Sequence, residues 1–163
     1  MRITVLGAGA WGASLAKVLH ENGNGVTLWD INAASLELAK NQLAPDVSTV
    51  VVDVGDSASV AAAVQQTQLT HKTIDALVNS AGITGPNVKL WDYPPDAWQQ
   101  VMQVNLNGVF HCCRAVVPVM RAQNYGRIVK ITETEVVFRE IVQDAVGEWI
   151  ERTATLQLQE RAK

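Results

Sequence analysis

Short apolar runs alternate with amphipathic stretches along most of this chain. Five of the runs predict strands of a parallel sheet, because they are rich in β-branched residues and are closed by turn residues. These runs are residues 2–7, 25–30, 47–54, 73–82 and 126–131. Between them, apolar residues recur at helical spacing. The predicted helices are residues 10–22, 32–43, 58–69 and about 96–123, with Asn32 and Ser57 as the expected caps and Pro118 as a kink or short break.

This alternation of strands and helices predicts the fold class. Strand–helix–strand units of this length form right-handed crossovers, so the strands lie parallel and helices cover both faces of the sheet. We therefore predict an α/β, Rossmann-like doubly wound sheet in three α/β/α layers, with strand order 3-2-1-4-5. The 163 residues suit a single domain, residues 1–163. A ligand is expected beyond the carboxyl ends of the strands, where the strand order reverses.

The last 32 residues follow a different pattern. Residues 132–135, "TETE", form a capping box, and apolar residues then recur at helical spacing from Val137 to Trp149. This pattern predicts a helix that covers a face of the sheet. Residues 154–159 alternate with period two, which leaves a sixth strand as the alternative to a continued helix.

Composition and charge exclude several functions. The formal net charge of −3 gives no electrostatic reason to expect binding to nucleic acid or to an anionic membrane. The chain has no apolar run of transmembrane length and no signal-peptide pattern, so a cytoplasmic location is expected. Cys112 and Cys113 are adjacent and have no histidine at metal-ligand spacing, which predicts two buried helix cysteines and no metal site.

A glycine motif follows the first predicted strand and opens the first predicted helix. Residues 7–12 read "GAGAWG", which matches the pattern G-x-G-x-x-G. Gly7 permits a tight turn, Gly9 lets the backbone approach a pyrophosphate, and Gly12 permits close packing of the helix on the strand. Ala8 and Ala10 complete the turn, and the helix N-terminus offers free N–H groups to phosphates. The alternative is a glycine-rich turn that serves packing alone.

An acidic residue lies where this motif requires one. Asp30 ends the second predicted strand, 18 residues after Gly12, and Ile31 follows it. A carboxylate there accepts hydrogen bonds from both ribose hydroxyls and repels a 2′-phosphate, which favours NAD(H) over NADP(H). Trp11 lies between the motif glycines, and its side chain is expected either in the cofactor cleft or across the helix surface.

The amino-terminal residues resemble one family of dehydrogenases. Residues 1–29 contain "ITVLGAGAWG", "LAKVL" and "ENG…VTLW", and they resemble the amino terminus of NAD-dependent glycerol-3-phosphate dehydrogenases. This resemblance implies that Gly7, Gly9, Trp11 and Gly12 meet the pyrophosphate.

Residues 30–131 resemble another family, the short-chain dehydrogenase/reductases. The resemblance rests on "DINAASLELA", "VVVDVGD", "IDALVNSAGITGP", "VNLNGVFHCCRAVVPVM" and "GRIVKI". It implies that Asp53 and Val54 flank the adenine and that residues 79–82 lie along the cofactor. Those four residues are Asn79, Ser80, Ala81 and Gly82. It also implies that Asn105 is the family's helix asparagine, which organises a catalytic water and lysine; the alternative is a helix residue bonded to neighbouring backbone.

The chain also departs from the second family. It has no T-G-x-x-x-G-x-G motif, no serine after Ser80, and no tyrosine followed by lysine at the spacing Tyr-x-x-x-Lys. In that family, this tyrosine is the general acid and base, and the lysine lowers its pKa. We therefore expect no catalytic residues and an engineered chimera of Rossmann fragments, with junctions near residues 29–30 and 131–132.

These observations lead to one main functional hypothesis. The chain is expected to bind NAD(H) as its one partner, to lack complete catalytic machinery and so not to be an enzyme, and to be a monomer or homodimer. The first alternative is a folding scaffold that binds no cofactor. The second alternative is an NAD-dependent oxidoreductase of the short-chain type.

Overall fold

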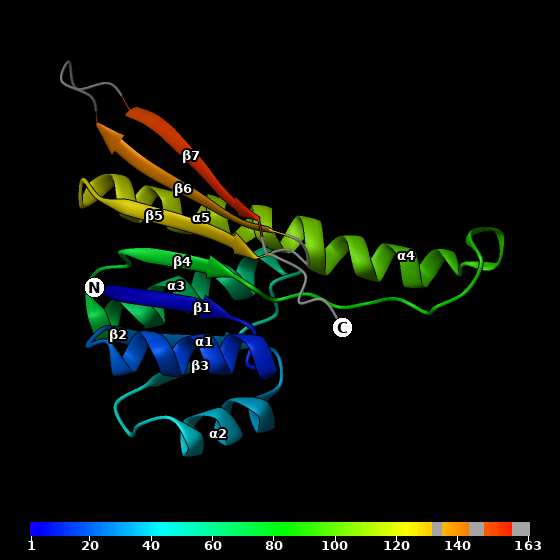
Figure 1. Cartoon of the computed structure of the whole chain (residues 1–163), viewed down its shortest axis with the longest axis horizontal. Coiled ribbons are helices and arrows are strands. Elements are labelled where there is room, and N and C mark those ends of the chain that lie inside the picture. The colour runs from blue at the N-terminus through cyan, green and yellow to red at the C-terminus, as the bar shows by residue number, and fades with distance from the viewer. Residues whose placement is uncertain (132–134, 144–148, 158–163) are drawn as a thin grey trace.

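One mixed sheet organises the chain (Figure 1). The computed structural model describes residues 1–131, 135–143 and 149–157. Its strands are β1 (Arg2–Leu6), β2 (Gly25–Asp30), β3 (Ser48–Val51), β4 (Ala76–Asn79), β5 (Gly126–Ile131), β6 (Glu135–Gln143) and β7 (Trp149–Gln157). The strand order is β3-β2-β1-β4-β5-β6-β7. The first five strands in the chain are parallel in the predicted order 3-2-1-4-5, so that prediction is confirmed.

Helices cover both faces of the parallel strands, as predicted (Figure 1). They are α1 (Ala10–Glu21), α2 (Ala33–Gln42), α3 (Ser57–His71), α4 (Pro95–Met102) and α5 (Gly108–Ala122). Alternate strand residues enter two separate cores, because successive side chains of a strand point to opposite faces. Leu6 and Trp29 pack on the side of α3 and α5, whereas Val5 and Leu28 pack on the side of α1 and α2.

Two helix starts within the described residues were predicted from capping residues, and one of them is wrong. The Asn32 side chain accepts hydrogen bonds from the backbone N–H groups of Ala34 and Ser35, which confirms this cap. Helix α3 is capped by Asp56 rather than by Ser57, which is its first residue. The Asp56 carboxylate accepts from Ala58 N at 2.9 Å. A carboxylate at this position also interacts favourably with the positive end of the helix dipole.

The long predicted helix is interrupted, but not at its proline. A π-helical segment, η2 (Gln103–Asn107), separates α4 from α5, and a 3₁₀ turn, η1 (Leu90–Asp92), precedes α4. Helix α5 continues through Pro118. Val116 and Met120, on either side of the proline, are fully buried in the core. Their packing offsets the backbone hydrogen bond that a proline removes.

The helix predicted after β5 is wrong over the described residues. Residues 135–143 and 149–157 form the antiparallel strands β6 and β7, so the strand alternative holds for 154–157. Strand β6 pairs with the edge of β5, from Gly126 opposite Ile141 to Ile131 opposite Val136. The free backbone groups of that edge and the β-branched residues of β6 favour a strand, and they outweigh the helical spacing. Residues 132–134, where the predicted capping box begins, residues 144–148, and residues 158–163, which include the end of the 154–159 stretch, lie outside the described residues.

Candidate functional site

The glycine turn lies between β1 and α1, at the point where the strand order reverses. Gly7 has a φ of +94°, a conformation that glycine adopts readily, and its N–H donates to Trp29 O at 2.7 Å. A Cβ on Gly12 would overlap the carbonyl oxygen of Gly7. A Cβ on Gly9 would meet no atom within 4 Å. The turn therefore needs Gly7 and Gly12 for its own geometry, whereas Gly9 keeps a space in front of the backbone open.

The N-terminus of α1 faces that space. Gly9 is the N-cap, and no side chain in the described part of the protein caps the helix there. The first turn of α1 contains no acidic residue. Its backbone N–H groups and the positive end of the helix dipole are therefore free to bind an anion.

Asp30 joins the end of β2 to the glycine turn. Its Oδ2 accepts a hydrogen bond from Ala8 N at 2.6 Å, and its Oδ1 accepts from Asn32 N at 2.7 Å. These two bonds fix the orientation of the carboxylate. Each carboxylate oxygen can accept a further hydrogen bond, so the group can still bind a ligand hydroxyl.

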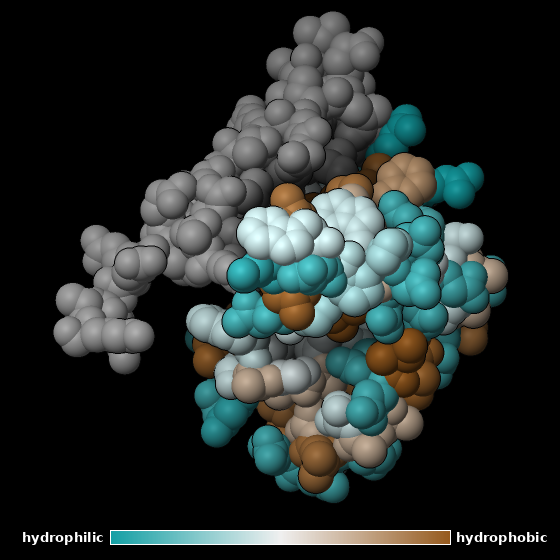
Figure 2. All heavy atoms as spheres, turned by 90° about the vertical axis from the view of Figure 1, so that its right-hand side faces the viewer, coloured by the Kyte–Doolittle hydropathy of each residue, from teal (hydrophilic) through white to brown (hydrophobic). Residues whose placement is uncertain are grey.

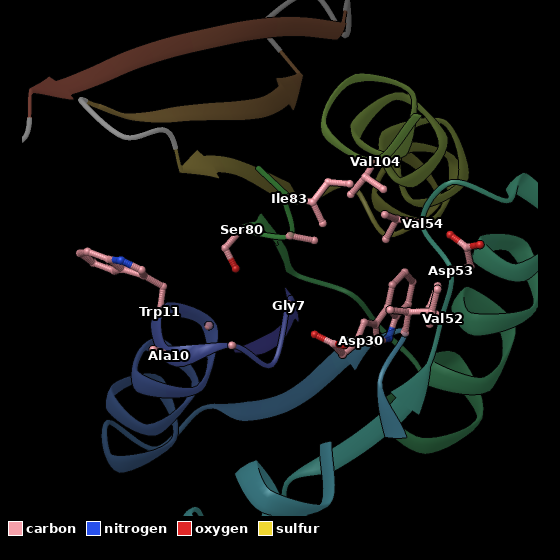
Figure 3. A pocket seen from close by; sticks show the side chains of 16 residues that line it. Gly7, Ala10, Trp11, Asp30, Val52, Asp53, Val54, Ser80, Ile83 and Val104 are labelled. Carbon is pink, nitrogen blue, oxygen red and sulfur yellow. The ribbon is translucent and has the colours of Figure 1, made fainter. Parts of the chain in front are cut away.

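A cavity of about 360 Å³ opens above these residues (Figure 3). It is lined by Gly7, Gly9, Ala10, Trp11, Gly12, Trp29, Asp30, Ile31, Val52, Asp53, Val54, Ser80, Ala81, Gly82, Ile83 and Val104. The structure thus brings together the cofactor residues expected from the sequence, except Ala8 and Asn79. Ala8 is buried beneath the turn, and its N–H is bound by Asp30. We call this space the first cavity.

A second cavity, of about 570 Å³, lies at the carboxyl ends of β4 and β5. It is lined by Trp11, Asn79, Ser80, Ala81, Gly82, Ile83, Thr84, Asn105, Val109, Lys130 and Ile131. Trp11 and residues 80–83 line both cavities, so the two spaces adjoin along the loop that follows β4. Trp11 is 74% exposed, so its side chain lies at the open rim of both cavities.

Two side chains hold this loop in place. The Ser80 hydroxyl donates a hydrogen bond to the carbonyl of Leu6, across from β4 to β1. Asn105, in the π-helical segment, accepts from Ile83 N and donates to Ile83 O, both at 2.9 Å. Asn105 was expected either to organise a catalytic water and lysine or to bond to neighbouring backbone. Its partner is instead a backbone 22 residues away, which helical periodicity could not indicate.

Several lining residues were not expected from the sequence. Ile83 and Val104 are apolar residues to which neither the motifs nor the resemblance gave a role, and Lys130 lies within a run that predicts only a buried strand. The one available signal for Lys130 was its position, because it stands near the carboxyl end of a strand beside the switch point. Of the two cations of β5, Arg127 and Lys130, Lys130 is the one nearer that end of the strand.

The cysteines and the helices give two further observations. Cys112 is buried, and burial together with the neighbouring Cys113 raises the pKa of its thiol to about 12. Cys113 is only partly buried, so the expectation of two buried cysteines holds for one of them. The described residues contain no group of three or more metal-ligating side chains, and their helices are all too short or too polar to span a membrane.

The exposed surface beside the cavities includes large apolar side chains. Leu90, Trp91, Trp98 and Phe110, from η1, α4 and α5, are all more than half exposed. Figure 2 looks on to the end of the molecule where the parallel strands end, and shows brown apolar residues dispersed among teal hydrophilic ones.

One family model accounts for most of the chain. The model for short chain dehydrogenases matches residues 2–141. The chain is 43% identical over 126 residues to a protein of Sphingomonas sp. (strain SKA58) named 2-dehydro-3-deoxy-L-rhamnonate dehydrogenase (NAD(+)). That match covers 77% of this chain and 50% of the relative. The chain is also 34% identical over 125 residues to a 3-oxoacyl-(acyl-carrier-protein) reductase of Chlamydia trachomatis serovar D, covering 74% of this chain and 50% of the relative.

Solved structures give the same result. An NAD⁺-bound xylitol dehydrogenase is 34% identical, with a TM-score of 0.76, and the match covers 79% of this chain and 51% of that one. A levodione reductase is 31% identical, with a TM-score of 0.75, and the match covers 79% and 52%. The chain therefore spans about half the length of the relatives that it matches.

These comparisons overturn two expectations from the sequence. The family model runs without interruption through residues 29–30 and 131–132, so the interpretation as an engineered chimera with a glycerol-3-phosphate dehydrogenase amino terminus is wrong. The glycine motif of residues 7–12 thus lies within the region that the family model matches, although it departs from T-G-x-x-x-G-x-G. The expectation that the chain is not an enzyme is contradicted as well, because the relatives are named dehydrogenases and reductases.

Proposed function

The chain belongs to the short chain dehydrogenase family, and on that premise we propose that it is the dinucleotide-binding part of a nicotinamide-dependent oxidoreductase. The observation that carries this proposal is the first cavity. There the open space before Gly9, the uncapped N-terminus of α1 and the fixed carboxylate of Asp30 meet in one cleft. Backbone N–H donors for a phosphate and a carboxylate acceptor for the ribose hydroxyls, at this separation along a βαβ unit, fit a dinucleotide.

The proposed binding mode follows the two cavities in turn. The pyrophosphate would bind the N–H groups at the start of α1, and the adenosine ribose would donate to Asp30. Asp53 and Val54, which line the far side of the first cavity, would flank the adenine. The nicotinamide would extend along Ala81 and Gly82 into the second cavity, past Asn79.

The preference proposed is for NAD(H) over NADP(H). A 2′-phosphate on the ribose would lie against the Asp30 carboxylate, and two like charges in contact are unfavourable. The Sphingomonas relative is named for NAD⁺, and the xylitol dehydrogenase structure holds NAD⁺, which supports the same preference.

A bound nicotinamide supplies hydride transfer, and this chain's own residues would position it for a substrate in the second cavity. Tyr93 and Tyr125, the two tyrosines of the sequence, are followed four positions later by Ala97 and Val129 rather than by lysine. The proposal therefore assigns cofactor binding and orientation to the residues that line the two cavities. It assigns the acid–base step to neither tyrosine.

A fluorescence titration with NADH and NADPH tests the proposal. We expect saturable NADH binding that is tighter than NADPH binding. Gly9→Val should abolish it, because the side chain fills the space before the backbone. Ala62→Val, on the exposed face of α3 and outside both cavities, is the matched control and should bind NADH like the parent. NADH binding that survives Gly9→Val, or no binding by the parent, would contradict the proposal.

A further inference from the structure

We propose that Lys130 makes the second cavity the binding site for a substrate with a carboxylate group. The proposal deepens the proposed function and rests on it for the identification of the ligand as a substrate. The carbonyl or alcohol that reacts would belong to the same molecule, since the second cavity adjoins the cofactor cleft along residues 80–83.

Sheet register fixes where Lys130 points. Lys130 on β5 is paired with Asn79 on β4, and paired residues on parallel strands point to the same face. The Asn79 side chain lies on the α5 side, with its Nδ2 3.9 Å from Cys113 Sγ. Lys130 therefore stands beside Asn79 under α5, where both residues line the second cavity.

The two cavities differ in their ionisable side chains. Lys130 is the one ionisable side chain among the described residues that line the second cavity, and it has no ion pair within that part of the chain. The first cavity is lined by the carboxylates of Asp30 and Asp53. The only ionisable side chain that the described lining of the second cavity offers a substrate is therefore a cation, which attracts an anionic group.

Asn79 provides a second, independent feature at the same place. Its side chain is 3% exposed, and its Oδ1 has no hydrogen-bond partner among the described residues. A buried carbonyl without a donor is unfavourable, and an ammonium group has three N–H donors. Lys130 can therefore donate one hydrogen bond to Asn79 Oδ1 and direct its other N–H groups toward a ligand.

A single ammonium selects a carboxylate over a phosphate. Lys130 balances the one charge of a carboxylate, whereas a phosphate group carries close to two charges at neutral pH. The second charge would be left uncompensated in a cavity whose other described lining is neutral. The substrate class that fits is an oxo acid or hydroxy acid.

The experiment compares three small probes on the full chain without cofactor, by isothermal titration or by NMR. The probes are levulinate, which carries a ketone and a carboxylate, its neutral methyl ester, and 2-oxopropylphosphonate. We expect the parent to bind levulinate about tenfold more tightly than the ester, which corresponds to one charge-assisted hydrogen bond. Lys130→Met should remove that difference, and Lys130→Arg should largely restore it. Lys40→Met, a lysine of α2 outside both cavities, should bind like the parent.

The outcomes separate this inference from the proposed function. Levulinate binding that depends on Lys130 supports the carboxylate site even if NADH does not bind, in which case only the proposed function fails. Equal binding of levulinate by the parent and by Lys130→Met, or no binding by the parent, overturns the inference whatever NADH does. Tighter binding of the phosphonate than of levulinate overturns the choice of a carboxylate. Unchanged thermal unfolding of Lys130→Met excludes misfolding as the cause of any loss.

Discussion

The carboxylate of Asp30 holds the backbone N–H of Ala8 at 2.6 Å and so joins the end of β2 to the glycine turn after β1. The same carboxylate holds Asn32 N, at the start of α2. One acidic side chain thus fixes two segments that border the first cavity. This arrangement couples the shape of the turn to the group proposed to bind the ribose.

The first prediction concerns this carboxylate. Asp30→Asn leaves one oxygen to accept from two backbone N–H groups, and its amide N–H₂ cannot accept. We expect NADH affinity to fall by about tenfold, the size of one lost charge-assisted hydrogen bond. NADPH should lose less, because the repulsion of its 2′-phosphate is also removed. The control is Asp92→Asn, which changes an exposed residue of η1. An unchanged ratio of NADH to NADPH affinity in Asp30→Asn would refute the assignment of Asp30 to the ribose.

A second prediction separates the glycines of the turn. Gly12→Ala places a methyl group on the carbonyl of Gly7, so the backbone must shift, and we expect a loss of about 3 kcal/mol in the free energy of unfolding. Gly9→Ala adds a methyl group where no atom lies within 4 Å, and it should change that free energy by less than about 1 kcal/mol. Urea denaturation measures both values. Equal losses would mean that the turn does not have the described geometry.

How much of this molecule follows from its sequence depends on the part considered. The order of the parallel strands and the site at their carboxyl ends followed from the alternation of apolar runs with helical stretches. The glycine motif and Asp30 were predicted because the residue type at each position follows from nearby sequence. The glycines permit the turn after β1, and the carboxylate stands at the end of β2. Residues of this kind can be predicted without knowing what lies across from them.

The rest depends on contacts between distant segments. Strand β6 forms because β5 presents a free edge, a fact that does not appear in the spacing of residues 135–143. Asn105 bonds to Ile83, and Lys130 faces the second cavity, through packing that no single segment specifies. The error over the chimera had another source: the glycine motif of residues 7–12 resembles that of another family, although the family model covers residues 2–141.

The third prediction uses two buried threonines of similar environment. Thr67 Oγ1 accepts a hydrogen bond from Trp29 Nε1 at 3.0 Å, and both side chains are at most 2% exposed. Thr67→Val keeps the shape but leaves the indole N–H without an acceptor, so we expect a loss of about 2 kcal/mol in the free energy of unfolding. Denaturant unfolding followed by tryptophan fluorescence provides the measurement.

Thr27 is the matched control for that substitution. It is 1% exposed, and its Oγ1 has no partner among the described residues. Thr27→Val removes an unsatisfied hydroxyl and should leave stability unchanged or raise it by up to about 1 kcal/mol. If Thr27→Val is as destabilising as Thr67→Val, the stability lost in Thr67→Val does not come from the hydrogen bond to Trp29.

The fourth prediction concerns pH. Burial, with a further contribution from Arg2, lowers the pKa of His71 from its usual 6.5. Below pH 6.5 the unfolded chain therefore binds a proton at this position that the folded chain does not, so stability falls as pH decreases through that range and levels off above it. His71→Gln should reduce the slope just below pH 6.5. Urea midpoints measured across this range test it, and an unchanged slope would assign the pH dependence to other groups.

The paired hydrogen bonds between Asn105 and Ile83 have a consequence for the kinetics of ligand entry. They tie the loop that separates the two cavities to the segment between α4 and α5, so this loop cannot swing aside alone. Either both bonds break in one local opening event, or the helical segment travels with the loop. The Ile83 amide hydrogen then exchanges with solvent only when the passage between the cavities opens. Its exchange rate therefore measures how often that opening occurs.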